Sequence, residues 1–528
     1  MTNLDEAISY HKTGQLDKAK EIYLELLKEN SNSTTVLNLL GVLYLKQQKY
    51  DEAEKFIKKA MELEPNTNTA YNLGLICYGK SDFLNAAKYF EQSIEDENDT
   101  DLIKQIASCY EKANDIKNAL LYYLKLNSKY PKNLEYIRKL ATLYNSEQEN
   151  ENALKFYLKS FELDKKDYIA CTNLGSLYEK LADTDKAKEF YKKSLKLKPN
   201  YEAYHNLGIL LRKQKKYQES ISCLQQALKL KPHDPKTELS LGMSYLIIKD
   251  FKNGFSHYRN KRPELKRHYH DDWDGKPYND ATALVYCGGG FGDYIMFSRY
   301  LPMLKNYFKE IILQVPKELK KLVNMNFPDF KTSSDKEEVV YNKSICMVDL
   351  PYLLNMNIDN IPDIKYIHDK DKAAGYKEKY FNTDKQKIGI FFRGNQNVFK
   401  NRSIPLKEMS PLFSLDKYKF YSFQKNDEEN QLEQFRQELA DLGATFDDFS
   451  DTASALVNLD LLITIDSGIA HLAGALGVRT FLMLPYANEW RWFDDAKTTP
   501  WYKSIELFRQ KEEGNWHSVI NEIYNKLK

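Results

Sequence analysis

The sequence predicts a two-part fold: an α solenoid of stacked helical repeats, followed by an α/β part with two parallel sheets. A small residue recurs every 33 or 34 residues through the first half of the 528-residue chain. Beyond residue 283, short apolar runs alternate with amphipathic segments, as in strand–helix units. At roughly 150 residues per domain the length suits three or four domains, so we expect more than one core.

The composition narrows the class of protein. The 77 basic and 75 acidic residues leave a net charge of +2, which argues against binding nucleic acid or anionic membranes by bulk charge. No run approaches about 18 consecutive apolar residues, and the first residues show no basic segment followed by an apolar one. The six cysteines are scattered without a Cys-x-x-Cys pair, as is typical of free thiols. We therefore expect a cytoplasmic protein without a membrane span.

Several sequence columns repeat through eight units of the first half. The small-residue column consists of Ala7, Gly41, Gly74, Ala107, Ala141, Gly175, Gly208 and Gly242. A tyrosine usually follows three positions later, another small residue twelve positions later, and a large apolar residue sixteen positions later. Small residues let two helices approach closely, and large residues fill the gaps between neighbouring units. Each unit is therefore predicted to be a helix pair that buries its apolar face only by stacking.

These columns resemble tetratricopeptide repeats over residues 3–262, and a linker follows at 263–282. In the similar repeat arrays of protein O-GlcNAc transferases, asparagines two positions before the small residue hold the backbone of a peptide. Asn72, Asn173 and Asn206 match that column, whereas other units depart from it. The resemblance implies that the solenoid binds an acceptor protein through these asparagines and offers a surface for self-association. The alternative is that an inner helix simply needs a polar residue facing solvent there.

The linker carries a cluster of His and Asp residues whose types could bind a metal ion. No second group of ligands follows at a suitable spacing, so a solvated connector is the preferred interpretation. The cluster consists of His268, His270, Asp271, Asp272 and Asp274.

The second half is predicted to form parallel strands, because strands buried on both faces read as continuous apolar runs. The apolar runs are 283–287, 310–315, 344–350, 387–392, 418–423, 459–465 and 479–485. Helical patterns follow at 293–306, 428–441 and 467–476. We expect two doubly wound lobes, residues 283–383 and 384–528.

Ligands of such folds bind beyond the carboxyl ends of strands, often at a helix N-terminus. The first loop there is Gly288-Gly289-Gly290-Phe291-Gly292-Asp293. Asp293 stands where a dinucleotide fingerprint needs glycine, and no Gly-Lys-Ser/Thr follows, which disfavours a nicotinamide or nucleoside-triphosphatase site. The glycines let a substrate approach the backbone, and Asp293 offers a carboxylate. Capping the following helix is its alternative role.

Two more loops carry groups suited to phosphates. The second contains Arg393-Gly394-Asn395 and then Lys400, Arg402 and Ser403, whose cations suit a pyrophosphate. The third is Asp466-Ser467-Gly468-Ile469-Ala470-His471, where backbone N–H groups begin a helix. A Ser–His–Asp hydrolase is disfavoured, because adjacent Asp466 and Ser467 cannot easily form a relay through one His. A packed core histidine is the alternative reading of His471.

Taken together, these loops resemble those of bacterial proteins that fuse tetratricopeptide repeats to a GT-B glycosyltransferase domain. That domain is related to the heptosyltransferases of glycosyltransferase family 9. The blocks that carry the resemblance are GGGFGDYIMFSRYLPML (288–304), KNRSIPL (400–406), FSDTASALVNLDLLITIDSGIAHLAGALG (449–477) and LPYANEWRWF…TPWYKSIELFRQ (484–510).

The resemblance implies transfer of a sugar from a nucleotide-sugar to an acceptor hydroxyl, without a metal ion or other cofactor. Asp293 matches the base that deprotonates the acceptor. The residues implied in donor binding are Gly290, Gly292, Arg393, Lys400, Arg402, Asp466, Ser467, Gly468 and His471. Flagellin or another surface protein is the expected acceptor. A non-catalytic scaffold with a degenerate sugar-nucleotide site is the alternative, and hydrolysis or epimerisation of a nucleotide-sugar is a third.

Overall fold

The computed structural model describes residues 3–96, 99–261, 271–334, 337–394, 402–425, 427 and 429–528. The chain divides into two compact units, Met1–Ala203 and Tyr204–Lys528. No helix within the described ranges is long and apolar enough to cross a membrane.

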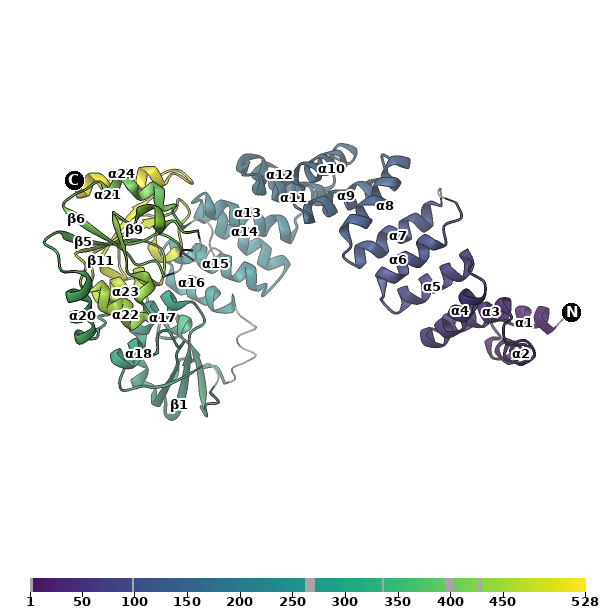
Figure 1. Ribbon diagram of the computed structural model, residues 1–528, viewed down its shortest axis with the longest axis horizontal. Helices are drawn as coiled ribbons and strands as arrows, with labels where there is room; N and C mark the ends of the chain where they lie inside the picture. Colours follow the sequence, from purple (N-terminus) through teal and green to yellow (C-terminus); the bar gives the residue numbers. More distant parts are fainter. Residues whose placement is uncertain are drawn as a thin grey trace. The chain divides into compact units, whose positions relative to one another are not determined.

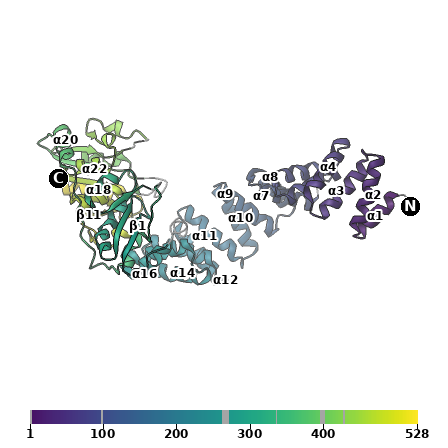
Figure 2. The same ribbon diagram turned by 90° about the horizontal axis from the view of Figure 1, so that it is seen from below.

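The first unit is built of helices that pack in consecutive pairs, α1 with α2, α3 with α4 and so on to α12 (Figures 1 and 2). The helices are α1 (Asn3–Lys12), α2 (Leu16–Glu29), α3 (Thr34–Lys46), α4 (Tyr50–Leu63), α5 (Thr67–Gly79), α6 (Phe83–Gln92), α7 (Thr100–Lys112), α8 (Ile116–Lys129), α9 (Leu134–Ser146), α10 (Asn150–Leu163), α11 (Tyr168–Lys180) and α12 (Thr184–Leu197).

The large residue sixteen positions later occupies the space beside the repeating small residue. A Cβ added at Gly41 would lie 2.4 Å from a side-chain carbon of Ile57, and one at Gly175 would lie 2.6 Å from the ring of Tyr191. Both distances are shorter than carbon–carbon contacts allow, so the two columns pack directly against each other. The predicted helix pairs are confirmed.

The turn inside each helix pair has a regularity that residue types do not reveal. The residue seven positions after each small residue has a positive φ, between 58° and 80°. These residues are Gly14, Gln48, Ser81, Asn114, Gln148, Ala182, Lys215 and Lys249. Only the first is a glycine, so the shared property is the left-handed backbone rather than the side chain.

The second unit begins within α13 (Tyr201–Lys213) and contains the last helices of the solenoid. These are α14 (Tyr217–Leu230), α15 (Pro235–Ile247) and α16 (Phe251–Tyr258), after which η1 (Arg259–Lys261) is a short 3₁₀ helix. Phe251, Phe255 and Tyr258 belong to the same hydrophobic core as the α/β part.

Two sheets follow the solenoid helices. The four-stranded sheet has the order β3-β2-β1-β4, with all its strands parallel. Its strands are β1 (Tyr278–Tyr286), β2 (Phe308–Gln314), β3 (Lys331–Ser333) and β4 (Lys343–Cys346).

The seven-stranded sheet has the order β10-β11-β9-β8-β5-β6-β7, and β10 pairs antiparallel to β11 while the other described pairs are parallel. Its strands are β5 (Gln386–Phe391), β6 (Tyr418–Ser422), β7 (Leu439–Asp441), β8 (Leu461–Ile465), β9 (Thr480–Leu484), β10 (Thr498–Thr499) and β11 (Tyr502–Arg509). The predicted α/β class with parallel sheets is confirmed.

Helices connect the strands, and α24 follows the last of them; several of these helices are labelled in Figure 1. In chain order they are α17 (Phe291–Phe297), η3 (Ser298–Asn306), α18 (Lys320–Asn326), η4 (Met347–Asp349), α19 (Leu350–Leu353), α20 (Lys370–Tyr380), η6 (Leu406–Met409), α21 (Ser410–Phe413), η7 (Leu432–Phe435), η8 (Gly443–Thr445), α22 (Phe449–Leu456), α23 (Gly468–Leu476), η9 (Trp490–Trp492) and α24 (Trp516–Leu527).

Two predicted helices differ from the structure. The helix expected at 293–306 becomes a 3₁₀ helix after Phe297, since Pro302 lies inside that segment and has no N–H to donate. The prediction of a helix at 428–441 is wrong. The described residues there form η7 and then strand β7, in which Leu439 pairs with Phe420 of β6.

Candidate functional site

The first and third predicted loops meet at the starts of α17 and α23. A Cβ added at Gly292 would lie 2.8 Å from Cδ2 of His471 and 3.5 Å from Cα of Gly468. A Cβ added at Gly468 would in turn lie 3.6 Å from the backbone nitrogen of Gly292. The two glycines thus let the two backbones approach each other.

Asp293 turns back over the first loop. The N–H of Gly290 donates to its Oδ2 at 3.1 Å, a capping contact at the start of α17. A Cβ at Gly289 would fall 2.1 Å from that same oxygen, so the position must be glycine for the carboxylate to lie there. The alternative capping role is therefore present. The other oxygen, Oδ1, forms an ion pair with the guanidinium of Arg491.

Arg491 is the centre of a buried charge network. Its side chain is 10% exposed, and besides Asp293 it contacts Oε2 of Glu489 at 3.2 Å and the hydroxyl of Tyr258 at 3.4 Å. Burial opposes its charge, but the neighbouring Asp293, Tyr258 and Glu489 raise the pKa of Arg491 well above its usual value. For Glu489, burial raises the pKa of the carboxyl group, and the charge of Arg491 acts in the opposite direction. The network therefore keeps Arg491 charged and paired.

The second loop meets the third through Arg402 and Asp466. Nη1 of Arg402 donates to the backbone carbonyl of Asp466 at 3.0 Å and to its Oδ2 at 3.3 Å. Arg402 thus lies beside the start of α23. Arg393 is directed elsewhere, with Nη2 3.1 Å from Oε1 of Glu429. Lys400 lies outside the described residues.

The start of α23 has no side-chain cap in the described structure. Ser467 is the N-cap residue, but its hydroxyl donates to the carbonyl of Ile465 at 3.1 Å. The first N–H groups of a helix lack intrahelical partners and carry a partial positive charge. This end of α23 therefore suits an anion.

His471 is enclosed directly behind the junction of the loops. Its Nδ1 lies 3.1 Å from the Tyr502 hydroxyl, and its ring stacks on Trp492 with centroids 5.0 Å apart. Burial lowers the pKa of His471 to about 4, so the imidazole is neutral at pH 7. In this structure His471 is a core residue that supports Gly292.

The asparagines of the solenoid have different surroundings. In the first unit, Nδ2 of Asn72 donates to Oδ1 of Asn38 at 2.9 Å, so this amide also links neighbouring repeats. Asn173 and Asn206 are half-buried on α11 and α13.

The sequence did not place Arg491, Glu489 or Tyr502 in the site, and it gave Tyr258 only the role of the large residue in the eighth repeat. The signal available was the Trp490-Arg491-Trp492 triplet, where an arginine stands between two large apolar residues. A buried cation needs an acidic partner, but the pattern cannot say which one.

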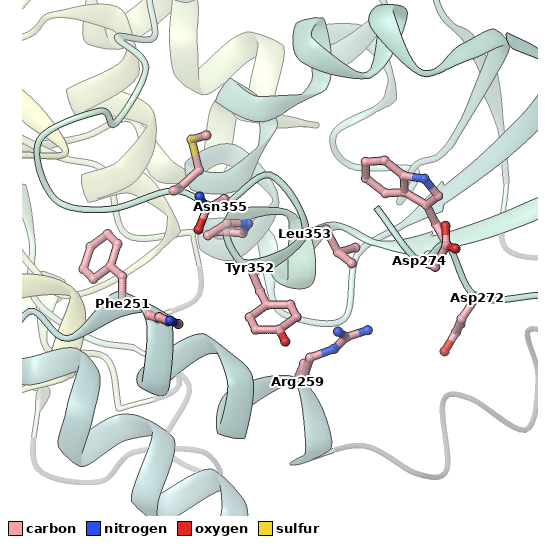
Figure 3. Close-up of a pocket in the computed structure, with 11 residues that line it drawn as sticks. Phe251, Arg259, Asp272, Asp274, Tyr352, Leu353 and Asn355 are labelled. Atoms are coloured by element: carbon pink, nitrogen blue, oxygen red, sulfur yellow. The ribbon is translucent and has the colours of Figure 1, made fainter. Parts of the chain in front are cut away.

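A cavity of about 600 Å³ lies elsewhere in the second unit, beside α16, η1 and α19 (Figure 3). The guanidinium of Arg259 lies 4.8 Å above the ring of Tyr352 at its wall, and Asp272 and Asp274 also line it. The predicted donor and base residues do not line this cavity. Among the described residues there is no group of three His, Cys, Asp or Glu side chains placed to hold a metal ion. His268 and His270 lie outside them.

Comparison with known families identifies the repeats. Models described as tetratricopeptide repeat match residues 4–33, 35–67, 105–133, 168–201 and 201–234. The N-terminal half of the chain is therefore a tetratricopeptide-repeat solenoid, followed by an α/β region with parallel sheets.

Two relatives are similar to parts of the chain. A TPR repeat-containing protein of Methanocaldococcus jannaschii is 36% identical over 122 residues, which cover 23% of this chain and 21% of that protein. Protein FlbA of Caulobacter vibrioides is 22% identical over 291 residues, which cover 48% of both. The chain thus spans less than half the length of either relative.

Similar solved structures include the C-terminal part of a TPR repeat-containing protein from Cytophaga hutchinsonii. It is 20% identical, with 45% of this chain and 99% of that one covered and a TM-score of 0.37. YrrB, a TPR protein with an unusual peptide-binding site, is 22% identical, with 35% and 96% covered and a TM-score of 0.30.

Proposed function

We propose that the second unit is a metal-independent glycosyltransferase of the GT-B type and that the repeats bind its protein acceptor. The observation that carries the proposal is the convergence of three loops at the carboxyl ends of parallel strands. They bring together the carboxylate of Asp293, the uncapped start of α23 and the guanidinium of Arg402. A carboxylate beside an anion site suits attack by a hydroxyl on a phosphate-activated sugar.

Asp293 is the proposed base. The acceptor hydroxyl gives its proton to this carboxylate while its oxygen forms a bond to the anomeric carbon of the sugar. The bond from that carbon to the phosphate oxygen breaks, and the nucleotide (a nucleoside diphosphate, or CMP from a CMP-sugar) leaves with the electron pair. General-base assistance of this kind typically contributes about 10²–10⁴-fold in rate.

The start of α23 and Arg402 are proposed to bind the donor phosphates. The partial positive charge at the start of α23, which no described side chain caps, and Arg402, which contacts Asp466, would offset the charge that grows on the leaving group. These groups take the place of a metal ion in the proposed mechanism.

The acceptor is proposed to be a protein, captured by the solenoid through Asn72, Asn173 and Asn206 and modified in the cytoplasm. Capture raises the local concentration of the acceptor near the transferase unit. Flagellin or another surface protein is the proposed class of acceptor.

A non-catalytic sugar-nucleotide-binding scaffold is the second candidate. The observation that favours it is that both oxygens of Asp293 already have partners, Gly290 and Arg491. Each carboxylate oxygen has two lone pairs, so Asp293 can still accept a proton from an acceptor hydroxyl. The contacts with Gly290 and Arg491 are equally consistent with a carboxylate that only holds the structure together.

Ligand-induced stabilisation followed by a transfer assay separates the two candidates. Purified protein is heated with UDP-, GDP-, ADP-, dTDP- and CMP-sugars, because a ligand that binds only the folded state raises the melting temperature. The stabilising donor is then incubated, radiolabelled in its sugar, with extract of the source cells. Label that enters protein supports transfer, whereas donor binding without transfer supports the scaffold.

A further inference from the structure

The block at 484–510 has no role in the proposed function so far, yet it provides the partner of the proposed base. Arg491 is the residue that reaches Asp293, and it also contacts Glu489 and Tyr258. Each of these side chains is mostly buried. An arginine buried at this point needs a structural reason to be there, since desolvating a cation is costly unless its partners are in place.

The segment that carries Arg491 is fixed on both sides. Nδ2 of Asn488 donates to the carbonyls of Glu489 at 3.0 Å and Phe493 at 3.2 Å. Nη2 of Arg509 donates to the carbonyls of Trp492 at 2.6 Å and Phe493 at 2.7 Å. Phe493, which accepts two of these bonds, has a φ of +46°, a strained value for a bulky residue. Arg491 therefore lies in a segment, residues 488–493, whose backbone is held by side-chain hydrogen bonds.

The last repeat packs directly against this segment and against Trp501. The ring of Phe255 lies edge-on to Trp490 with centroids 5.5 Å apart, and the ring of Phe251 stacks on Trp501 at 5.7 Å. Tyr258, the large-residue column of the eighth repeat, places its hydroxyl 3.4 Å from Nη2 of Arg491. In other repeats this column packs against the small residue of its own helix pair, whereas here it also contacts the charge network.

We propose that Arg491 is a positioning residue for the carboxylate of Asp293 and that Tyr258, from the last repeat, helps to hold it. This proposal rests on the proposed function. Arg491 holds Oδ1 while the N–H of Gly290 holds Oδ2, so the plane of the carboxylate is fixed. The last tetratricopeptide repeat then contributes a side chain, Tyr258, to the transferase site.

The test uses full-length Arg491→Lys, Arg491→Gln and Tyr258→Phe, with kcat and the donor KM measured separately. Lysine keeps one charge but cannot contact Asp293, Glu489 and Tyr258 at once, so kcat falls by about 10-fold. Glutamine removes the charge, and kcat falls by about 10²-fold, as expected for a misplaced catalytic group. Tyr258→Phe keeps the ring and removes only one contact of Arg491, so Asp293 is displaced less than in the Arg491 variants. Its kcat is expected to fall by about 3-fold to 10-fold. The donor KM and the melting-temperature shift caused by the donor stay at wild-type values.

Tyr245→Phe is the matched control, since the Tyr245 hydroxyl on α15 accepts from Nε2 of Gln225 at 2.8 Å and does not contact Arg491. Its kcat is expected to equal that of wild type. A wild-type kcat in both Tyr258→Phe and Arg491→Lys overturns the positioning role, as does an equal loss in Tyr245→Phe. If Asp293→Asn also retains full activity, the base assignment itself fails. If the wild-type protein transfers no sugar, both proposals fail together.

Discussion

The carboxylate of Asp293 pairs with the guanidinium of Arg491, which lies 198 residues further along the chain. Asp293 follows β1 of the four-stranded sheet, and Arg491 follows β9 of the seven-stranded sheet. The ion pair therefore joins groups that two different sheets position. Correct folding of the second unit is a condition for the proposed base to be in place.

Gly292→Ala is predicted to damage the junction of α17 and α23, whereas Gly290→Ala is tolerated. The new methyl group at 292 would lie 2.8 Å from the enclosed ring of His471, while no atom lies within 4 Å of a Cβ at 290. Overpacking of this kind costs about 1–3 kcal/mol of unfolding free energy. Urea unfolding followed by tryptophan fluorescence measures it, because all five tryptophans lie in residues 204–528. Equal stability of the two variants would contradict the close approach.

His471 is predicted to make the second unit less stable as the pH falls from about 6.5 to about 4. Burial lowers the pKa of His471 to about 4, whereas the unfolded chain takes up a proton near the ordinary value of 6.5. The unfolded state thus binds more protons in this window, and the contribution lost is at most about 3 kcal/mol.

His471→Gln removes this contribution, so its unfolding free energy depends less on pH between 7 and 4.5 than that of wild type. His517→Gln, at an exposed position of α24, controls for the substitution of histidine by glutamine itself. If His471→Gln and wild type show the same slope, His471 is not held neutral by burial.

Ala182→Gly is predicted to stabilise the solenoid, which is rare for a substitution to glycine. Ala182 has a φ of 60°, and a left-handed backbone costs about 1–2 kcal/mol for a residue with a Cβ. Asn114, with a φ of 59°, tolerates this region better, so Asn114→Gly gains less. Helical circular dichroism during thermal unfolding compares the two. A melting temperature of Ala182→Gly below that of wild type would rule the account out.

Arg402→Met is predicted to weaken donor binding by about 10-fold or more, because a charge-assisted contact to phosphate is worth roughly 1.5–3 kcal/mol. Lys407→Met removes a cation from an exposed position in the same region and leaves affinity unchanged. Calorimetric titration with the stabilising nucleotide-sugar gives both dissociation constants. An unchanged affinity of Arg402→Met would place the phosphates away from Asp466 and α23.

The repeats were predictable because each one obeys the same local constraint. Gly41 and Ile57 show it: a small residue and a large residue sixteen positions later must pack, and this spacing appears in the sequence. The buried strands were similarly visible as apolar runs, and every predicted run overlaps an observed strand. β11 was missed because its polar and apolar residues are mixed, and the change to 3₁₀ geometry after Phe297 depends on one proline.

The candidate site was predictable only in part. The place of each loop at the carboxyl end of a strand follows from the fold class. The approach of Gly292, after β1, to Gly468, after β8, joins two different sheets and agrees with the expected ligand site between two lobes. The pairing of Asp293 with Arg491 does not follow, because two sheets and the last repeat must first take up their places. Nor could the sequence show that His471 lies in the core, since a helix start suits both a ligand and a packed side chain.

Sugar transfer by wild type and by Asp293→Asn tests the central proposal most directly. Both proteins are first shown to bind the same nucleotide-sugar, by its effect on their melting temperatures. Radiolabelled sugar entering protein is then measured over time. We expect equal donor binding and a transfer rate for Asp293→Asn that is lower by about 10²–10⁴-fold. Transfer by Asp293→Asn at the wild-type rate, or no transfer by the wild-type protein with any donor that binds, would contradict the proposal.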